Sequence, residues 1–181
     1  MPRCYIALVI LLMSSAWAAP QKAFHRLLMF NQQGQLMVVK IKGTDFWVTP
    51  GLYSTDEDFS PSRLHTLAGE YGLTINAPVL HGEFVLQFTN DTPDSTRYFY
   101  RAVVQGGTTT LPEAISEVRW LSVEDALKTM TFPHINLLTA QIEQHPDSVW
   151  QARIKRYQHN GAYKADLVSD FVAIRPIERP E

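Results

Sequence analysis

Three residues, Thr66, Gly69 and Glu70, are spaced at i, i+3 and i+4 in a segment that predicts a helix over residues 60–72. Residues at these spacings share one face of a helix. Glu70 is the only carboxylate in the segment, Thr66 supplies a neutral hydroxyl, and Gly69 supplies no side chain. Because Mg2+ uses one or two protein carboxylates, this face could hold such an ion only through Glu70.

The helix itself is predicted from its ends and from its apolar spacing. Ser60 is a suitable N-cap, Pro61 fits the first turn, and Gly72 stands where a helix end favours a left-handed residue. Apolar residues repeat at i, i+3, i+4 and i+7 on the opposite face: Leu64, Leu67, Ala68 and Tyr71. This stripe predicts that one side of the helix is buried in a core.

Extended segments and two more helices surround this segment. Residues 24–30 and 36–43 predict a hairpin around Gly34, and further strands are predicted at 78–88 and 97–105. A short extended piece precedes a helix capped by Ser122, and 135–144 predicts another helix. In 149–174, Asn160-Gly161 separates two β-prone runs, which is the strongest hairpin signal in the chain.

The first eighteen residues resemble a signal peptide rather than part of the core. Arg3 precedes the apolar run 6–13, and Ala16-Trp17-Ala18 offers small residues for cleavage after Ala18. The alternative is an uncleaved membrane anchor, although the run is shorter than the roughly 20 residues a spanning helix needs. We therefore expect an exported protein, in a bacterial periplasm or secreted, with no membrane association after signal removal.

Composition limits the function classes further. The chain has 181 residues, of which 45% are hydrophobic, and this is enough for one globular core. Its single cysteine, Cys4, would leave with the signal peptide, so the mature chain would have no disulfide. The formal net charge is −2 and no basic stripe stands out, which argues against nucleic acid as a partner.

Residues 51–73 resemble the Nudix box, whose pattern is G-x5-E-x7-R-E-U-x-E-E-x-G-U with U a bulky apolar residue. Six positions match: Gly51, Glu57, Leu67, Glu70, Gly72 and Leu73. His65, Thr66 and Gly69 replace an arginine and two glutamates, so the box is degenerate. The preceding WVTPG and the later EVRWLSVEDAL also resemble the family. The alternative is an unrelated α+β domain with a chance spacing.

The resemblance implies a fold and a domain organisation. We expect an α+β protein with a Nudix-like α/β/α sandwich around a mixed sheet in residues 22–145. Residues 146–181 are expected to form a C-terminal β-hairpin extension that packs on this domain.

The resemblance also implies roles for individual residues. Nudix enzymes cleave diphosphates with Mg2+ or a similar cation, and box glutamates bind the metal. Glu70 is then the catalytic residue and a metal ligand, and Glu57 is a second metal ligand or, with His65, a brace of the loop. Gly51, His65 and Gly72 are structural positions of the box. Glu70 and Glu57 could also be plain surface residues.

Two functions follow from these expectations. The first is a divergent hydrolase that uses Mg2+ or Mn2+ to cleave a nucleoside diphosphate derivative or similar diphosphate, with a carboxylate borrowed from Glu83, Glu113 or Glu117. The second is a non-catalytic domain that needs no metal and binds a small-molecule diphosphate or a protein partner. We favour the second, because a threonine and a glycine cannot replace metal-binding carboxylates.

Overall fold

The computed structural model describes residues 23–55, 57–88 and 94–177. The predicted signal peptide and Cys4 lie outside these residues. Within them, no helix has both the length and the apolar character needed to cross a membrane.

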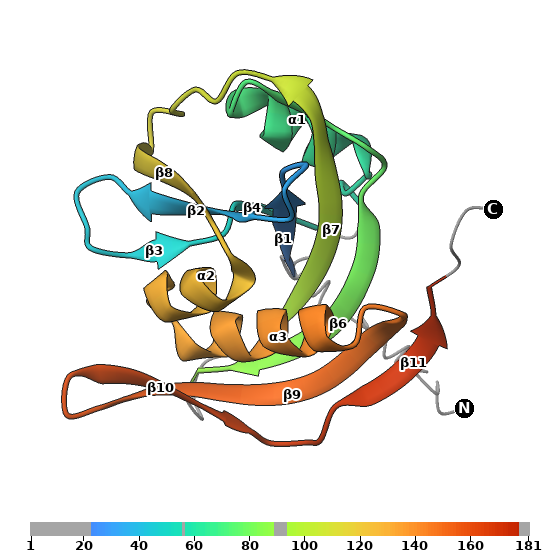
Figure 1. The fold of residues 1–181 in the computed structure, drawn as a ribbon. Helices are drawn as coiled ribbons and strands as arrows, with labels where there is room; N and C mark the ends of the chain where they lie inside the picture. Colours follow the sequence, from blue (N-terminus) through green and yellow to red (C-terminus); the bar gives the residue numbers. More distant parts are fainter. Residues whose placement is uncertain (1–22, 56, 89–93, 178–181) are drawn as a thin grey trace, which may run out of the picture.

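The described residues form a curled mixed sheet with three helices (Figure 1). The strands are β1 (Ala23–Phe30), β2 (Leu36–Ile41), β3 (Trp47–Val48), β4 (Gly51–Ser54), β5 (Leu73–Ile75), β6 (Val79–Gln87), β7 (Ser95–Gly107), β8 (Ile115–Leu121), β9 (Ser148–His159), β10 (Ala162–Leu167) and β11 (Val172–Pro176). The helices are α1 (Ser62–Glu70), α2 (Val123–Thr129) and α3 (Pro133–Gln144). The main path of the sheet runs β10-β9-β6-β7-β1-β2-β3. Two pairs, β1 with β7 and β6 with β9, are parallel, and the other pairs are antiparallel.

The two faces of the sheet bury two separate cores. Successive residues of a strand point to opposite faces, and β1 supplies Leu27 and Met29 to one core and Leu28 and Phe30 to the other. The first core packs against α1, and the second packs against α2 and α3. The predicted α+β fold, with helices on both faces of a mixed sheet, is confirmed.

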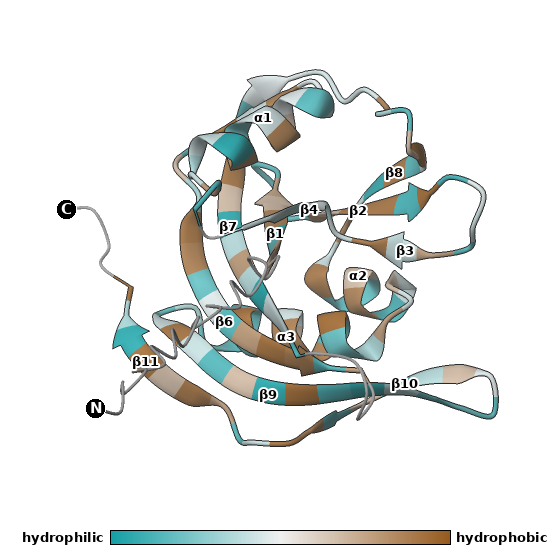
Figure 2. Cartoon of the chain, turned by 180° about the vertical axis from the view of Figure 1, so that it is seen from behind, coloured by the Kyte–Doolittle hydropathy of each residue, from teal (hydrophilic) through white to brown (hydrophobic). Residues whose placement is uncertain are grey.

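The C-terminal hairpin is also confirmed, and it extends the main sheet. Asn160 and Gly161 both have positive φ, at 50° and 78°, and they join β9 to β10 as the sequence predicted. β9 then pairs in parallel with β6, so the hairpin continues the sheet at its edge. Figure 2 shows hydrophobic and hydrophilic residues following one another along β9, as expected of a strand with one buried face.

The start of α1 differs from the prediction. The helix begins at Ser62, and Pro61 occupies the N-cap position in helical conformation with no side-chain cap bond. Ser60 instead places its hydroxyl 2.8 Å from that of Ser62. By contrast, Ser122 caps α2 as predicted, since its Oγ accepts a hydrogen bond from Asp125 N at 3.1 Å.

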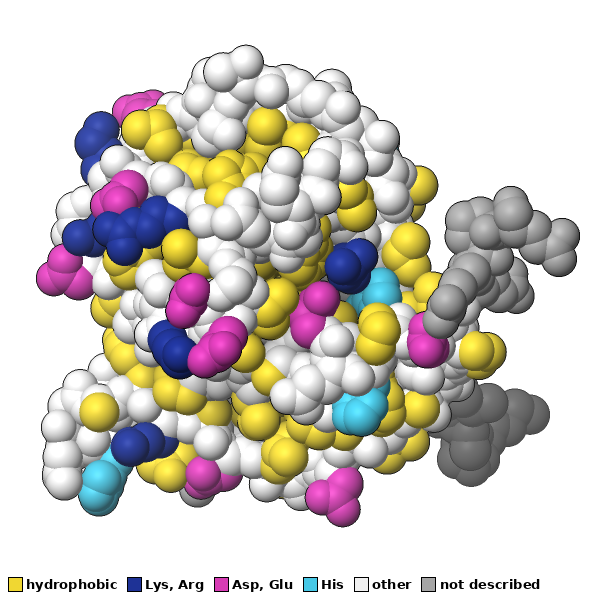
Figure 3. All heavy atoms as spheres, viewed as in Figure 1, with side chains coloured by type: hydrophobic (Ala, Val, Ile, Leu, Met, Phe, Trp, Pro, Cys, Tyr) yellow, Lys and Arg dark blue, Asp and Glu magenta, His cyan; other side chains and the backbone are white. Residues whose placement is uncertain are grey.

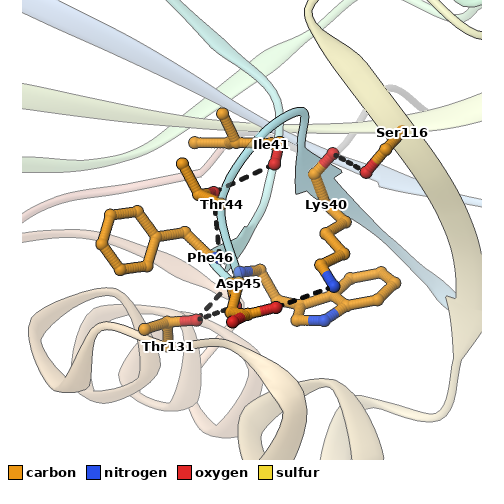
Figure 4. Close-up of polar contacts among 8 residues, drawn as sticks. Lys40, Ile41, Thr44, Asp45, Phe46, Ser116 and Thr131 are labelled. Carbon is orange, nitrogen blue, oxygen red and sulfur yellow. Dashed lines mark hydrogen bonds and ion pairs between the residues drawn. The ribbon is translucent and has the colours of Figure 1, made fainter.

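The turn between β2 and β3 is fixed by side chains from several elements (Figure 4). Lys40 Nζ lies 3.0 Å from Asp45 Oδ1, and Thr44 Oγ1 donates to the carbonyl of Ile41 at 3.0 Å. Trp47 N donates to Thr131 Oγ1 at 2.8 Å, and Thr131 N donates back to Trp47 O at 2.9 Å. These contacts tie β3 to the α2–α3 connection, and they set the course of the chain just before Thr49-Pro50-Gly51.

Candidate functional site

The buried face of α1 anchors the helix as the apolar stripe predicted. Leu64 and Ala68 are fully buried, and Leu67 and Tyr71 are 7% and 4% exposed. Burial, followed by the neighbouring charge of Glu70, raises the pKa of Tyr71 to about 12. The Tyr71 hydroxyl is therefore neutral at physiological pH and is part of the core.

The opposite face of α1 carries one carboxylate. Thr66, Gly69 and Glu70 are all exposed, as their shared spacing predicted. Thr66 Oγ1 donates a weak hydrogen bond of 3.3 Å to Ser62 O one turn earlier. A Cβ added at Gly69 would meet nothing within 4 Å, so this part of the face is open.

The loop before α1 is held by contacts that sequence reasoning missed. Glu57 and His65 are both exposed, and no hydrogen bond or ion pair between described residues joins them. Instead, Arg63 Nη1 donates to Ser54 Oγ at 2.7 Å. Thr55 Oγ1 donates to the carboxylate of Asp58 at 2.6 Å. The signal for this brace in the sequence was Arg63, a basic residue in the first turn of α1.

Both box glycines occupy places that exclude a side chain. A Cβ at Gly51 would overlap the ring of Phe24. Gly72 has φ +71°, and a Cβ there would overlap the carbonyl oxygen of Thr108. Gly72 ends α1 in the left-handed conformation that the sequence predicted.

The face of α1 does not fit a cluster of metal ions. In the stretches that the structure describes, no three His, Cys, Asp or Glu side chains gather closely enough to hold a metal. Two of the candidate extra ligands are engaged elsewhere, because Glu117 pairs with Arg119 at 2.6 Å and Glu83 lies 3.6 Å from Arg175. On the face shown in Figure 3, acidic and basic side chains lie in small mixed groups.

A cavity of about 540 Å³ lies beside α1, and Glu70 is part of its wall. β1 and β2 pair at Phe30 and Leu36 and then separate. Where they have separated, Leu27 N of β1 donates a hydrogen bond of 2.9 Å to Pro50 O. The Thr49-Pro50-Gly51 segment therefore lines the cavity together with α1, the start of α3 and residues of β1, β7 and β9. This volume is typical of a pocket for a small molecule.

Three arginines line this cavity: Arg26 from β1, Arg97 from β7 and Arg156 from β9. Arg26 is 7% exposed and donates from Nη1 to Thr49 O at 2.6 Å and to Thr49 Oγ1 at 2.9 Å. Burial, with added repulsion from Arg97, lowers the pKa of Arg26 to about 9. Burial and the same arginine also lower the pKa of Arg156.

His134 lies in the same wall and is 6% exposed. Burial, followed by repulsion from the three arginines, holds the pKa of His134 far below its usual range. The imidazole is therefore neutral. Part of the lowering of its pKa comes from the positive charge of the three arginines.

Sequence reasoning did not identify the three arginines. Arg26 and Arg97 stand inside predicted strands among apolar and aromatic neighbours, FHRLLMF and TRYFYRAV. A charged residue within a largely buried strand was the available signal, because such a charge is costly unless it is paired or used.

The sequence matches no model of a known protein family, and no curated protein matches it. The fold, however, is similar to that of several solved structures. The MutT protein from Bacillus halodurans superposes with a TM-score of 0.59 at 13% identity, over 80% of this chain and 97% of that chain. A UDP-X diphosphatase gives 0.57 at 16% identity, over 78% and 71%. An ADP-ribose pyrophosphatase from Streptococcus suis gives 0.52 at 14% identity, over 77% and 100%.

The first of these neighbours is a MutT protein, and a Nudix hydrolase from Nitrosomonas europaea also superposes, with a TM-score of 0.57 at 10% identity, over 70% of this chain and 72% of that chain. At such low identity the similarity concerns the fold. The chain has the fold of the Nudix hydrolases.

Proposed function

We propose that this protein is a Nudix-fold domain that binds a small-molecule anion in the cavity beside α1 and does not hydrolyse it. The diphosphate class expected from the family resemblance is the first candidate ligand. The apolar run in the first eighteen residues supports the further proposal that the domain acts outside the cytoplasm, in a periplasm or secreted.

One observation carries the proposal: the exposed face of α1 offers a single carboxylate. Glu70 is accompanied by Gly69, which has no ligand atom, and by Thr66, whose hydroxyl is turned toward Ser62 O. Diphosphate cleavage by metal ions depends on neutralising the charge that develops on phosphate oxygens. One carboxylate does not provide the ligands for two or three such ions.

The second candidate is a divergent hydrolase with Glu70 as the catalytic metal ligand. The fold similarity supports it, since the neighbours include proteins named as pyrophosphatases and diphosphatases. In this case Mg2+ or Mn2+ would be held by Glu70, water and the substrate phosphates. Glu57, which is exposed in the loop before α1, would then be the further ligand to test.

Titration of the full chain with Mg2+ and Mn2+ by calorimetry separates the two candidates. We compare the native sequence with Glu70→Gln and with Glu124→Gln as a matched control. Glu124 is an exposed helix glutamate that pairs with Lys128. The same samples are assayed for phosphate release from a panel of diphosphates.

The proposal predicts no saturable millimolar metal binding and no phosphate release. Saturable binding that is lost in Glu70→Gln but kept in Glu124→Gln, together with phosphate release, would establish the hydrolase instead.

A further inference from the structure

Three guanidinium groups from separate strands converge on one set of aromatic rings. Arg26 Cζ lies 4.8 Å from the centre of the Phe24 ring, and Arg97 Cζ lies 5.1 Å from the same ring. Arg97 and Arg156 likewise share the ring of Phe88, at 5.7 and 5.0 Å. Each arginine is thus held by a ring that also contacts its neighbour, which keeps the three cations together.

These cations have no acidic partner in the described part of the chain. The six ion pairs found between residues 23–55, 57–88 and 94–177 involve other basic residues. Within the described ranges, the Arg26 side chain donates its hydrogen bonds to two neutral oxygens of Thr49. Arg97 is 9% exposed, and its buried Nε has no hydrogen-bond partner among the residues that the structure describes.

Such an arrangement is unfavourable for the empty fold. A buried charge without a counterion loses its hydration, and contacts with aromatic rings and neutral oxygens replace only part of that loss. Among the described residues that line the cavity, Glu70 on α1 is the one carboxylate, and it cannot neutralise three guanidinium groups. The cavity therefore has an excess of positive charge, an unused buried donor and room for a ligand.

We propose that Arg26, Arg97 and Arg156 form a metal-independent site for a multivalent oxyanion, with phosphate or carboxylate groups, carried by a small molecule. A guanidinium presents a planar fork of donors that fits either oxyanion. Phe24 and Phe88, which line the same cavity, provide an apolar surface for the rest of the ligand. Here the arginines supply the positive charge that metal ions supply in a hydrolase.

This inference rests on the proposed function only in treating the cavity as a ligand site, and it is tested without any hydrolysis. The full chain is titrated by calorimetry with inorganic pyrophosphate and, separately, with citrate, in the presence of EDTA. The two probes distinguish phosphate from carboxylate ligands. Arg97→Met and Arg156→Met remove one guanidinium each, and Arg119→Met is the control, because Arg119 lies over Trp47 and pairs with Glu117 outside the cavity.

We expect saturable binding of at least one probe in EDTA. Either cavity substitution should weaken it by about tenfold or more, since each removes a charge-assisted contact. Arg119→Met should leave the affinity unchanged. Denaturant unfolding supplies a second readout: without ligand, Arg97→Met should unfold at the same or a higher denaturant concentration, whereas a purely structural arginine would leave a less stable fold.

Three results would overturn the proposal: no binding of either probe, binding that neither cavity substitution affects, or binding that appears only with Mg2+. Its failure is distinct from failure of the proposed function. Phosphate release with Mg2+ together with arginine-dependent binding in EDTA would refute the non-catalytic role and leave the oxyanion site standing.

Discussion

Two glycines at the end of α1, Gly69 and Gly72, should respond to the same substitution in opposite directions. Gly69 is exposed and helical, and a Cβ there meets nothing within 4 Å. Gly69→Ala should therefore stabilise the protein by about 0.5–1 kcal/mol, because alanine loses less backbone entropy in a helix. Packing therefore does not require a glycine at position 69.

Gly72→Ala combines two costs. At φ +71° an L-residue pays about 1–2 kcal/mol for the left-handed conformation. The new methyl group would also displace the carbonyl of Thr108 and lie 3.0 Å from Thr110 Oγ1, and overpacking of this kind costs about 1–3 kcal/mol. The expected loss is about 2–5 kcal/mol. Thr110 N is bonded to Tyr71 O at 2.9 Å, so the loop cannot move away freely.

Urea unfolding followed by circular dichroism measures both variants against the native chain. The midpoint should rise for Gly69→Ala and fall for Gly72→Ala, with the dependence on urea unchanged. A loss of stability in Gly69→Ala would refute the open space assigned to Gly69, because the added methyl group would then have to meet other atoms. A neutral Gly72→Ala would refute the conformation assigned to the end of this helix.

The remaining predictions concern pH and metal binding. Burial, then repulsion from Arg101, lowers the pKa of His81 to about 4, so the unfolded chain takes up the proton first as pH falls. The stability associated with neutral His81 is complete above about pH 6.5 and is lost toward pH 4, by up to roughly 3 kcal/mol. Urea unfolding across this range should show the decline. The dependence of the unfolding free energy on pH should be shallower in His81→Leu and unchanged in the exposed control His159→Leu. The double substitution Thr66→Glu with Gly69→Glu places three carboxylates on the open face of α1, and calorimetry should detect Mg2+ binding absent from the native chain. If the double variant binds no Mg2+, the face lacks the geometry of a Nudix metal site, whatever residues it carries.

Local signals in the sequence predicted the features that depend on nearby residues. The stripe on α1, the left-handed Gly72 and the turn at Asn160-Gly161 each follow from the conformational preferences of a few adjacent residues. Ser60 was the exception, because Pro61 takes the helical conformation at the N-cap position and the preceding serine is one residue too early to cap. A cap depends on the exact register, which residue preferences alone do not fix.

Features built from distant segments were beyond such signals. The parallel pairs β1–β7 and β6–β9 join strands with no short connection, so no turn residue indicates them. The three arginines of the cavity share no local pattern either, since they come from separate strands. Sequence reasoning placed Glu70 in a candidate site, but it did not place that carboxylate in the wall of the same cavity as three arginines.

The pairing of β9 with β6 also bears on how the chain acquires its structure during synthesis. Both β1 and β6 find their parallel partners about seventy residues further along the chain, and contacts this distant in sequence form slowly. Arg156, one of the three arginines that line the cavity, is delivered with β9, after most of the chain has been made. A nascent chain that stops before β9 leaves the edge of β6 unpaired, and such edges promote aggregation. The last fifth of the chain thus completes the cavity, and a product truncated before β9 should be insoluble.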